Sequence, residues 1–131
     1  MKILIVEDDL ISRRLLQKFL LPYGDCETAV DGLKAITAIE HAFINDQPYD
    51  LICLDIMMPQ MDGHEVLKKI RDIETQKNID GNNRVKIIMT TALTDRGNVV
   101  QAAKEKCDAY IAKPINKQEL QRKLQSLGLL K

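Results

Sequence analysis

Five side chains that can take part in chemistry stand at the ends of separate apolar runs. Glu7 and Asp8 follow the first run, Asp55 ends another, and Thr91 and Lys113 stand at the ends of two more. If these runs are parallel strands, their carboxyl ends lie along one edge of a sheet, where ligands bind in open α/β folds. We therefore expect the five side chains to converge on one cleft.

Three carboxylates in one cleft predict a bound metal ion. Glu7, Asp8 and Asp55 repel one another when they are crowded, and burial raises their pKa values further. A hard divalent cation relieves both costs. Mg²⁺ fits because it accepts one or two carboxylates, keeps several waters and binds a phosphate oxygen. The sequence therefore predicts an Mg²⁺ site, with Mn²⁺ as the alternative ion.

The other two groups are donors suited to phosphoryl transfer. Lys113 is a compact positive charge on a flexible stem, and Thr91 offers a hydroxyl. A cation, an ammonium and a hydroxyl around one carboxylate stabilise charge on a transferring phosphoryl group. In that arrangement Asp55 is the nucleophile and an aspartyl phosphate is the product. The simpler reading of Asp55 is a strand-end acid that caps a turn, and the other four groups in register argue against it.

Five strands must position these groups. The first is a continuous apolar run, of the kind that is buried on both faces of a parallel sheet, and the third ends in Asp55. Pro59 prevents ladder pairing after the third strand and bends the chain away. The strands are expected over residues 2–6, 25–30, 51–55, 85–90 and 109–112.

Helical patterns alternate with these strands. The first helix is expected to pack through Ile11, Leu15 and Phe19, with Leu16 and Leu20 beside them. The N-caps are expected at Asp9, Asp62 and Asn116, whereas Asp31 and Gly32 form a turn. The later helices are expected to face inward through Leu33, Ile36, Ile39 and Phe43, then Val66, Leu67, Ile70 and Ile73, then Val99, Ala102 and Ala103 within residues 95–106, and finally Leu120, Leu124 and Leu127.

This alternation predicts the fold class. We expect an α/β fold with a doubly wound, five-stranded parallel sheet of order 2-1-3-4-5 and five helices, a flavodoxin-like three-layer sandwich. That order makes the first and third strands neighbours, so Glu7 and Asp8 come beside Asp55. No second domain or repeat is visible, so residues 1–131 are expected to be one domain that lacks an output domain.

Composition excludes several function classes. The formal net charge is zero, which gives no reason to expect direct binding to nucleic acid or insertion into a membrane. No apolar run approaches the roughly 18 residues of a spanning helix, and no signal-peptide pattern is present, so a cytoplasmic location is expected. Cys26, Cys53 and Cys107 are expected to be reduced thiols, and His41 and His64 to be surface residues.

The motifs together resemble the receiver domain of two-component response regulators, over essentially the whole chain. The resemblance depends on the runs at residues 5–9, 54–63, 91–92 and 110–114. It implies that Asp55 accepts a phosphoryl group from a histidine kinase or a histidine phosphotransfer protein. It also implies that Glu7 and Asp8 hold Mg²⁺ with Asp55, and that the backbone carbonyl of Met57 is a further ligand.

The resemblance assigns roles to the remaining motif residues. It implies that Thr91 and Lys113 contact the phosphoryl group and that Ala92 is the small residue beside it. Tyr110 matches the aromatic that changes rotamer with Thr91, in addition to its expected role as a partly buried packing residue. Gly63 and Pro114 are structural positions of the motifs, as Pro59 is, and the Lys113–Pro114 bond is often cis in this family.

The resulting hypothesis is a phosphorylation-dependent signalling switch and not a metabolic enzyme. Its partner surface is expected over about residues 95–127, and the chain is expected to be a monomer or a phosphorylation-dependent dimer. One alternative is an Mg²⁺-dependent phosphohydrolase with an aspartyl nucleophile, although no second acid stands two positions after Asp55. The other is an interaction module of the same fold that works without phosphorylation. No Gly-rich loop follows the first strand, which argues against a dinucleotide binder.

Overall fold

The computed structural model describes residues 1–58, 61–92 and 107–130. Pro59 and the helix expected over residues 95–106 lie outside the described residues, as does the side chain of Ala92. Within the described residues no helix is both long enough and apolar enough to cross a bilayer.

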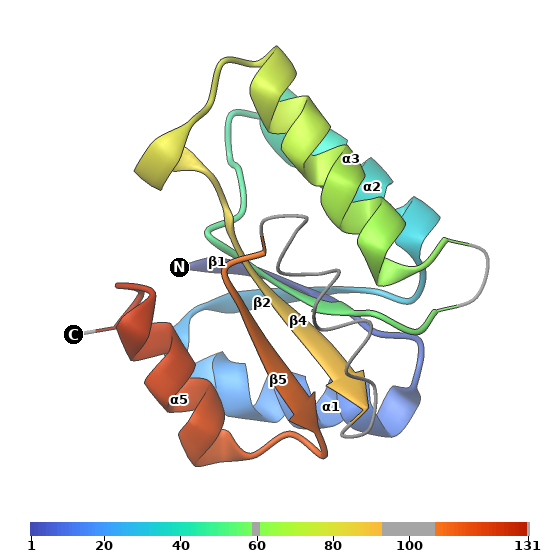
Figure 1. Cartoon of the computed structure of the whole chain (residues 1–131), viewed down its shortest axis with the longest axis vertical. Coiled ribbons are helices and arrows are strands. Elements are labelled where there is room, and N and C mark those ends of the chain that lie inside the picture. The colour runs from blue at the N-terminus through green and yellow to red at the C-terminus, as the bar shows by residue number, and fades with distance from the viewer. Residues whose placement is uncertain (59–60, 93–106, 131) are drawn as a thin grey trace.

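The centre of the molecule is a five-stranded parallel sheet of order β2-β1-β3-β4-β5, as predicted (Figure 1). All four strand pairs are parallel, and β1 lies between β2 and β3. The carboxyl ends of β1 and β3 therefore lie side by side. The strands are β1 Lys2–Val6, β2 Asp25–Ala29, β3 Leu51–Asp55, β4 Lys86–Ala92 and β5 Ala109–Lys113.

Helices cover both faces of the sheet. α2 and α3 lie on one face, and α1 and α5 lie on the other (Figure 1). The helices are α1 Leu10–Leu20, α2 Gly32–Ile44, α3 Gly63–Gln76 and α5 Lys117–Ser126, with 3-10 turns η1 Leu21–Tyr23 and η2 Gly81–Asn83. Each helix begins after an N-cap whose side chain accepts a hydrogen bond from the backbone N–H three residues on; the caps are Asp9, Asp31, Asp62 and Asn116. The turn expected at Asp31 is therefore the cap of α2.

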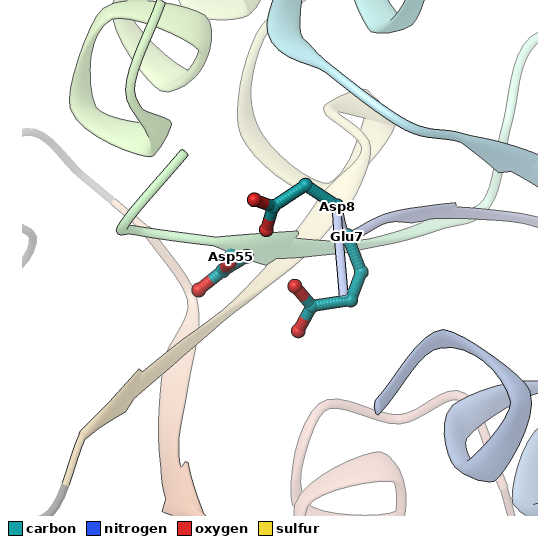
Figure 2. A group of neighbouring side chains, drawn as sticks. All are labelled: Glu7, Asp8 and Asp55. Carbon is teal, nitrogen blue, oxygen red and sulfur yellow. The ribbon is translucent and has the colours of Figure 1, made fainter. Parts of the chain in front are cut away.

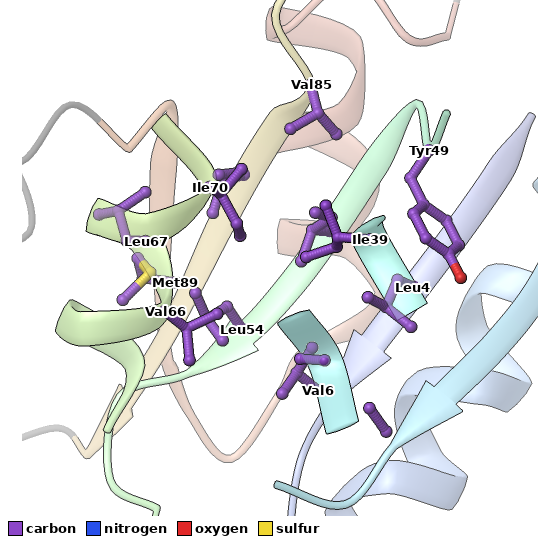
Figure 3. Close-up of a cluster of buried hydrophobic side chains, with 14 of the residues drawn as sticks. Leu4, Val6, Ile39, Tyr49, Leu54, Val66, Leu67, Ile70, Val85 and Met89 are labelled. Atoms are coloured by element: carbon purple, nitrogen blue, oxygen red, sulfur yellow. The ribbon is translucent and has the colours of Figure 1, made fainter. Parts of the chain in front are cut away.

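Strand alternation divides the apolar side chains into two cores. Leu54 and Met89 face α2 and α3, where they join Val66, Leu67 and other residues of the α2/α3 core (Figure 3). The intervening strand residues, such as Cys53, face the α1/α5 core on the other side. Because β3 is buried on both faces, all five of its residues are buried.

Two helix faces differ from the predicted pattern. Ile11 is 78% exposed and Leu33 is 54% exposed, although both were expected to face inward. Each stands in the first turn of a helix that begins just after a strand ends, so no strand lies beneath it. The packing of α1 is provided instead by Leu16 and Leu20, which are almost fully buried.

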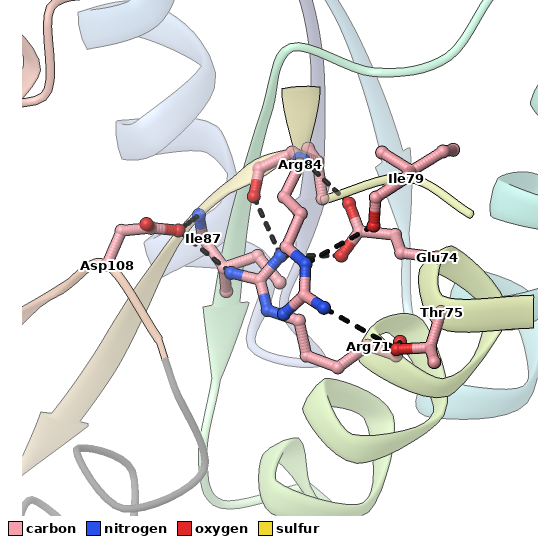
Figure 4. Close-up of polar contacts among 8 residues, drawn as sticks. Arg71, Glu74, Thr75, Ile79, Arg84, Ile87 and Asp108 are labelled. Carbon is pink, nitrogen blue, oxygen red and sulfur yellow. Dashed lines mark hydrogen bonds and ion pairs between the residues drawn. The ribbon is translucent and has the colours of Figure 1, made fainter. Parts of the chain in front are cut away.

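A buried ionic group, here named the Arg71 cluster, joins Arg71, Glu74 and Asp108 (Figure 4). Nη1 of Arg71 donates to Oε1 of Glu74 at 2.7 Å and to the Val85 carbonyl at 3.0 Å, and Nη2 donates to Oδ2 of Asp108 at 2.9 Å. The backbone N–H groups of Val85 and Ile87 donate to Glu74 and Asp108, each at 2.7 Å. The cluster therefore fastens the C-terminal part of α3 to the chain that enters β4 and β5.

Candidate functional site

The three predicted carboxylates meet at the carboxyl ends of β1 and β3 (Figure 2). Val6 pairs in register with Leu54, so Glu7 and Asp8 leave β1 directly beside Asp55. One oxygen from each of the three lies within 4.8 Å of the other two. Glu7 is completely buried and Asp55 is 3% exposed, whereas Asp8 is exposed.

Lys113 reaches these carboxylates from the edge strand β5. Its Nζ lies 2.6 Å from Oε1 of Glu7 and 3.2 Å from Oδ1 of Asp55. Oε1 of Glu7 accepts no further hydrogen bond from the described residues. Among the described residues, one ammonium thus contacts the two buried carboxylates while the exposed Asp8 lies beside them, and this set carries excess negative charge when all three acids are ionised.

The electrostatics of the site follow from this imbalance. Burial raises the pKa of Asp55 to about 7, helped by the hydrogen bond and charge of Glu7, while Lys113 opposes the shift. Burial lowers the pKa of Lys113, but the hydrogen bond to Glu7 and the charge of Asp55 outweigh it and raise that pKa overall. Lys113 is therefore a permanent cation at neutral pH, whereas Asp55 is poised near its titration point.

The donor set fits a hard divalent cation. Mg²⁺ binds oxygen ligands at about 2.1 Å, so two direct ligands lie at most about 4.2 Å apart. Three carboxylate oxygens that all lie within 4.8 Å of one another therefore suit an ion that some of them bind directly and others through water. The buried Glu7 oxygen that lacks a further hydrogen bond is a natural partner for such a water.

Backbone donors orient the carboxylates. The N–H of Met57 donates to Oδ1 of Asp55 and the N–H of Asp9 donates to Oε2 of Glu7, each at 3.3 Å. The Asp9 side chain is the N-cap of α1, as expected, and accepts from the Ser12 N–H at 2.9 Å. The role of the Met57 carbonyl as a ligand stays a prediction.

Gly63 allows α3 to begin directly against β3. A Cβ at this position would lie 2.4 Å from the carbonyl oxygen of Asp55, and the Gly63 N–H donates to the Ile56 carbonyl at 2.9 Å. The close approach also buries the neighbouring His64, which is 6% exposed, so its expected surface position was wrong. His41 is exposed, as predicted.

The remaining predicted residues stand at the ends of β4 and β5. Thr91 is buried near the end of β4, and Ala92 is the last residue of that strand. Tyr110 is 42% exposed, so it is an exposed residue and not the partly buried packing residue that was expected. The Lys113–Pro114 peptide bond is cis, as the resemblance implied. The contacts expected between Thr91 or Ala92 and a phosphoryl group stay predictions.

The sequence pattern did not point to Thr90. This residue pairs in register with Asp55, and its carbonyl accepts a hydrogen bond from the Ile56 N–H at 3.0 Å. It is 1% exposed, and none of the described residues provides a hydrogen bond to its hydroxyl. Only the register between the third and fourth strands pairs Thr90 with Asp55, and the apolar patterns of the two strands do not determine that register.

The three cysteines are poor candidates for a nucleophile. Cys26, Cys53 and Cys107 are free thiols. Burial raises the pKa of all three, for Cys53 to about 12. These thiols are therefore protonated at neutral pH and are poor nucleophiles.

Comparison with known sequences agrees with this geometry. The family model of the response regulator receiver domain matches residues 3–125. The chain is 35% identical over 127 residues to the probable transcriptional regulator ycf27 of Cyanophora paradoxa, covering 96% of this chain and 47% of that protein. It therefore spans less than half the length of this relative.

Two solved structures are similar over nearly the whole chain. The receiver domain of sensor histidine kinase PA1611 from Pseudomonas aeruginosa, which has a magnesium ion coordinated in its active-site cleft, is 29% identical with a TM-score of 0.76, covering 97% of each chain. A chain from the co-crystal structure of the Saccharomyces cerevisiae phosphotransfer protein Ypd1 with the Ssk1 receiver domain is 28% identical with a TM-score of 0.80, covering 98% of this chain and 88% of that one. With the sheet order and the strand-end carboxylates in agreement, this protein belongs to the response regulator receiver domain family of two-component signalling.

Proposed function

We propose that this chain is a phosphorylation-dependent signalling switch whose phosphoryl acceptor is Asp55. The observation that carries the proposal is the meeting of Asp55 with Glu7, Asp8 and Lys113 at one edge of the sheet. Receiver domains are signalling regulators and not enzymes with an external metabolite, so the proposed chemistry is limited to the domain's own phosphorylation and dephosphorylation.

Glu7, Asp8 and Asp55 are the proposed ligands of Mg²⁺, with the Met57 carbonyl as a further ligand and Mn²⁺ as an alternative ion. When bound, the cation would neutralise the excess carboxylate charge and the charge of an incoming phosphoryl group. It would also favour ionised Asp55, whose pKa of about 7 otherwise leaves much of it protonated.

The proposed reaction is an in-line phosphoryl transfer. One carboxylate oxygen of Asp55 attacks the phosphorus of a phosphohistidine, the phosphorus–nitrogen bond breaks, and the donor imidazole leaves as the new phosphorus–oxygen bond forms. The Lys113 ammonium is already within 3.2 Å of Asp55 and is proposed to turn to a phosphoryl oxygen. Thr91 and Ala92, at the end of β4, are proposed to lie beside that group.

The proposed donor is a histidine kinase or a histidine phosphotransfer protein. The Ssk1 receiver domain, which has been crystallised with the phosphotransfer protein Ypd1, provides a similar fold in such a complex. The proposed output is a change of the surface over about residues 95–127, in which Thr91 and Tyr110 move together. A monomer or a phosphorylation-dependent dimer suits this output.

The test is intact mass after incubation with acetyl phosphate and Mg²⁺. We expect wild type to gain one phosphoryl group and Asp55→Asn to gain none. Asp72→Asn, which removes an exposed acid on α3, is the matched control and should be labelled as wild type is. Labelling that persists in Asp55→Asn would show a different acceptor. Failure of wild type to bind either phosphoryl group or beryllofluoride would leave a receiver fold that works without phosphate.

Lys113→Ala is expected to permit labelling of Asp55 but to weaken its effect on the partner surface, because the residue that links the phosphoryl group to β5 is lost. The measurement is the beryllofluoride-induced shift of amide resonances between residues 109 and 127. Lys69→Ala, an exposed lysine on α3, is the control. Shifts of wild-type size in Lys113→Ala would contradict the expectation.

A further inference from the structure

We infer that Thr90 is a positioning residue of the phosphorylated state: its hydroxyl donates a hydrogen bond to the carboxyl group of Asp55 once Lys113 has turned to the phosphoryl group. The inference depends on the proposed function, and it adds a residue that the sequence motifs do not contain. It is argued from the face of the sheet on which Thr90 lies, from the path of the Lys113 side chain and from the unpartnered hydroxyl.

Strand alternation places Thr90 on the same face as the reactive groups. Ile88, two residues earlier on β4, belongs to the α1/α5 core. Cys53 on β3 belongs to the same core, so Asp55 shares its face. Thr90 and Asp55 are paired directly in register. Paired residues of adjacent strands stand about 4.8 Å apart, which brings a threonine hydroxyl within reach of a carboxylate.

The Lys113 side chain passes over this residue. Lys113 pairs with Ala92, and Ile111 pairs with Thr90, so β4 separates β5 from Asp55. The Nζ of Lys113 nevertheless lies 3.2 Å from Oδ1 of Asp55 on β3. The stem of the lysine therefore crosses β4 on the face of the sheet where Thr90 lies.

A buried hydroxyl without a partner requires an explanation. Thr90 is 1% exposed, and none of the described residues bonds to its Oγ1. Such a group costs stability compared with valine, which has nearly the same shape and equal preference for strands. If threonine only packed here, valine would do so at lower cost. The hydroxyl is explained if another state of the site provides its partner.

Phosphorylation provides that partner. When the phosphorus–oxygen bond forms, one oxygen of Asp55 becomes the bridging atom and the other becomes the carbonyl oxygen of an acyl phosphate. The Lys113 ammonium, which contacts Asp55 in the free protein, is drawn to the more negative phosphoryl oxygens. The carboxyl group then loses a donor, and the Thr90 hydroxyl is the neighbouring donor that has no other bond.

The experiment compares beryllofluoride affinity in Mg²⁺ for wild type, Thr90→Val and Thr90→Ser. We expect Thr90→Val to bind about tenfold more weakly, the effect of losing one hydrogen bond of ordinary strength to a charged group. Thr90→Ser keeps the hydroxyl and should restore most of the affinity. Without beryllofluoride, Thr90→Val should unfold at the same or a higher denaturant concentration than wild type.

The controls separate this role from simple packing and from failure of the proposed function. Thr28→Val makes the same change at an exposed position of edge strand β2 and should leave beryllofluoride affinity unchanged. Equal affinity of wild type and Thr90→Val, or equal loss in Thr90→Val and Thr90→Ser, would overturn the positioning role. Absence of binding by wild type would overturn the proposed function and this inference with it.

Discussion

Among the residues that the structure describes, two ionic groups are largely buried, and they are built differently. At the carboxyl edge of the sheet, Glu7 and Asp55 share the ammonium of Lys113, and the exposed Asp8 lies beside them. At the opposite edge, where β4 and β5 begin, the Arg71 cluster surrounds one guanidinium with two carboxylates and a backbone carbonyl. Both groups are largely buried, yet only the second has donors and acceptors in balance.

The two groups differ in how well backbone N–H donors complete the hydrogen bonds of their carboxylates. In the Arg71 cluster, backbone N–H groups of Val85 and Ile87 complete the carboxylates at 2.7 Å. At Asp55 the corresponding backbone bond, from Met57, is 3.3 Å long, and a buried oxygen of Glu7 has no partner among the described residues besides the Lys113 ammonium. Charged groups whose hydrogen bonds are all made stabilise the fold. Charged groups whose hydrogen bonds are incomplete can still bind a ligand.

Arg71→Met should produce the largest loss of stability. It leaves the buried Glu74 carboxylate without its cation and removes the partner of the more exposed Asp108, and breaking a buried pair costs about 3–5 kcal/mol. The measurement is the unfolding free energy from denaturant titration. Arg14→Met on the exposed side of α1 is the control and should change it by about 0.5 kcal/mol or less. A loss below about 1 kcal/mol in Arg71→Met would show that the two ionic groups are not as different as their geometry indicates.

The contribution of Asp55 to the unfolding free energy should fall as pH rises, whereas the contribution of an ordinary paired carboxylate increases with pH. The pKa of this carboxyl is about 7 in the folded protein, whereas its ordinary value in an unfolded chain is 3.8, so the folded state binds more protons between these limits. The contribution of Asp55 to the unfolding free energy therefore falls as pH rises through this window, by a few kcal/mol at about 1.4 kcal/mol per pKa unit.

The measurement is the difference in unfolding free energy between wild type and Asp55→Asn in Mg²⁺-free buffer. The variant should gain on wild type as pH rises from about 4 to about 7, and the gain should then level off. Added Mg²⁺ should reduce the gain, because the cation stabilises only the ionised carboxylate. A pH-independent difference would show that Asp55 titrates normally in the folded protein.

Glu27→Gln should have the smallest effect and provides a surface reference for both buried groups. Nζ of Lys2 lies 3.9 Å from Oε2 of Glu27, and the two side chains are 27% and 55% exposed. Exposed pairs of this kind contribute less than about 1 kcal/mol, and glutamine retains an acceptor for the Tyr49 hydroxyl. Denaturant titration of the variant should therefore nearly reproduce wild type. A loss of unfolding free energy above about 1 kcal/mol would mean that Lys2 and Glu27 do not behave as an ordinary exposed ion pair.

The fold and the candidate site could be predicted because topology determines where strand ends meet. Once the third strand was read as residues 51–55 and the order as 2-1-3-4-5, Asp55 had to lie beside Glu7 and Asp8, and the structure confirms this. Charge imbalance at such an edge is visible in the sequence, since the acids and the lysine stand at the last positions of their strands or directly after them.

The Arg71 cluster could not be predicted in the same way. Arg71 and Glu74 look like ordinary polar positions of an amphipathic helix, and only the chain entering β4 and β5 makes that side an interior. Ile11 and Leu33 are exposed for a related reason. The apolar pattern of a helix does not show where the sheet beneath it ends. The periodicity of apolar residues shows which side of a helix faces inward. The burial of each residue depends on what packs against its own turn of the helix.

Helix α3 joins the two ionic groups and is held at both ends. Its 14 residues extend about 21 Å; Gly63 lies against the Asp55 carbonyl at the first residue, and Arg71 and Glu74 make their hydrogen bonds in the second half. A helix that is held near both ends resists sliding and bending. We therefore expect α3 to keep its position if the shape of the site changes. If Asp55 is phosphorylated as proposed, we expect the structural response to fall on the carboxyl ends of β4 and β5, where Thr91 and Lys113 stand.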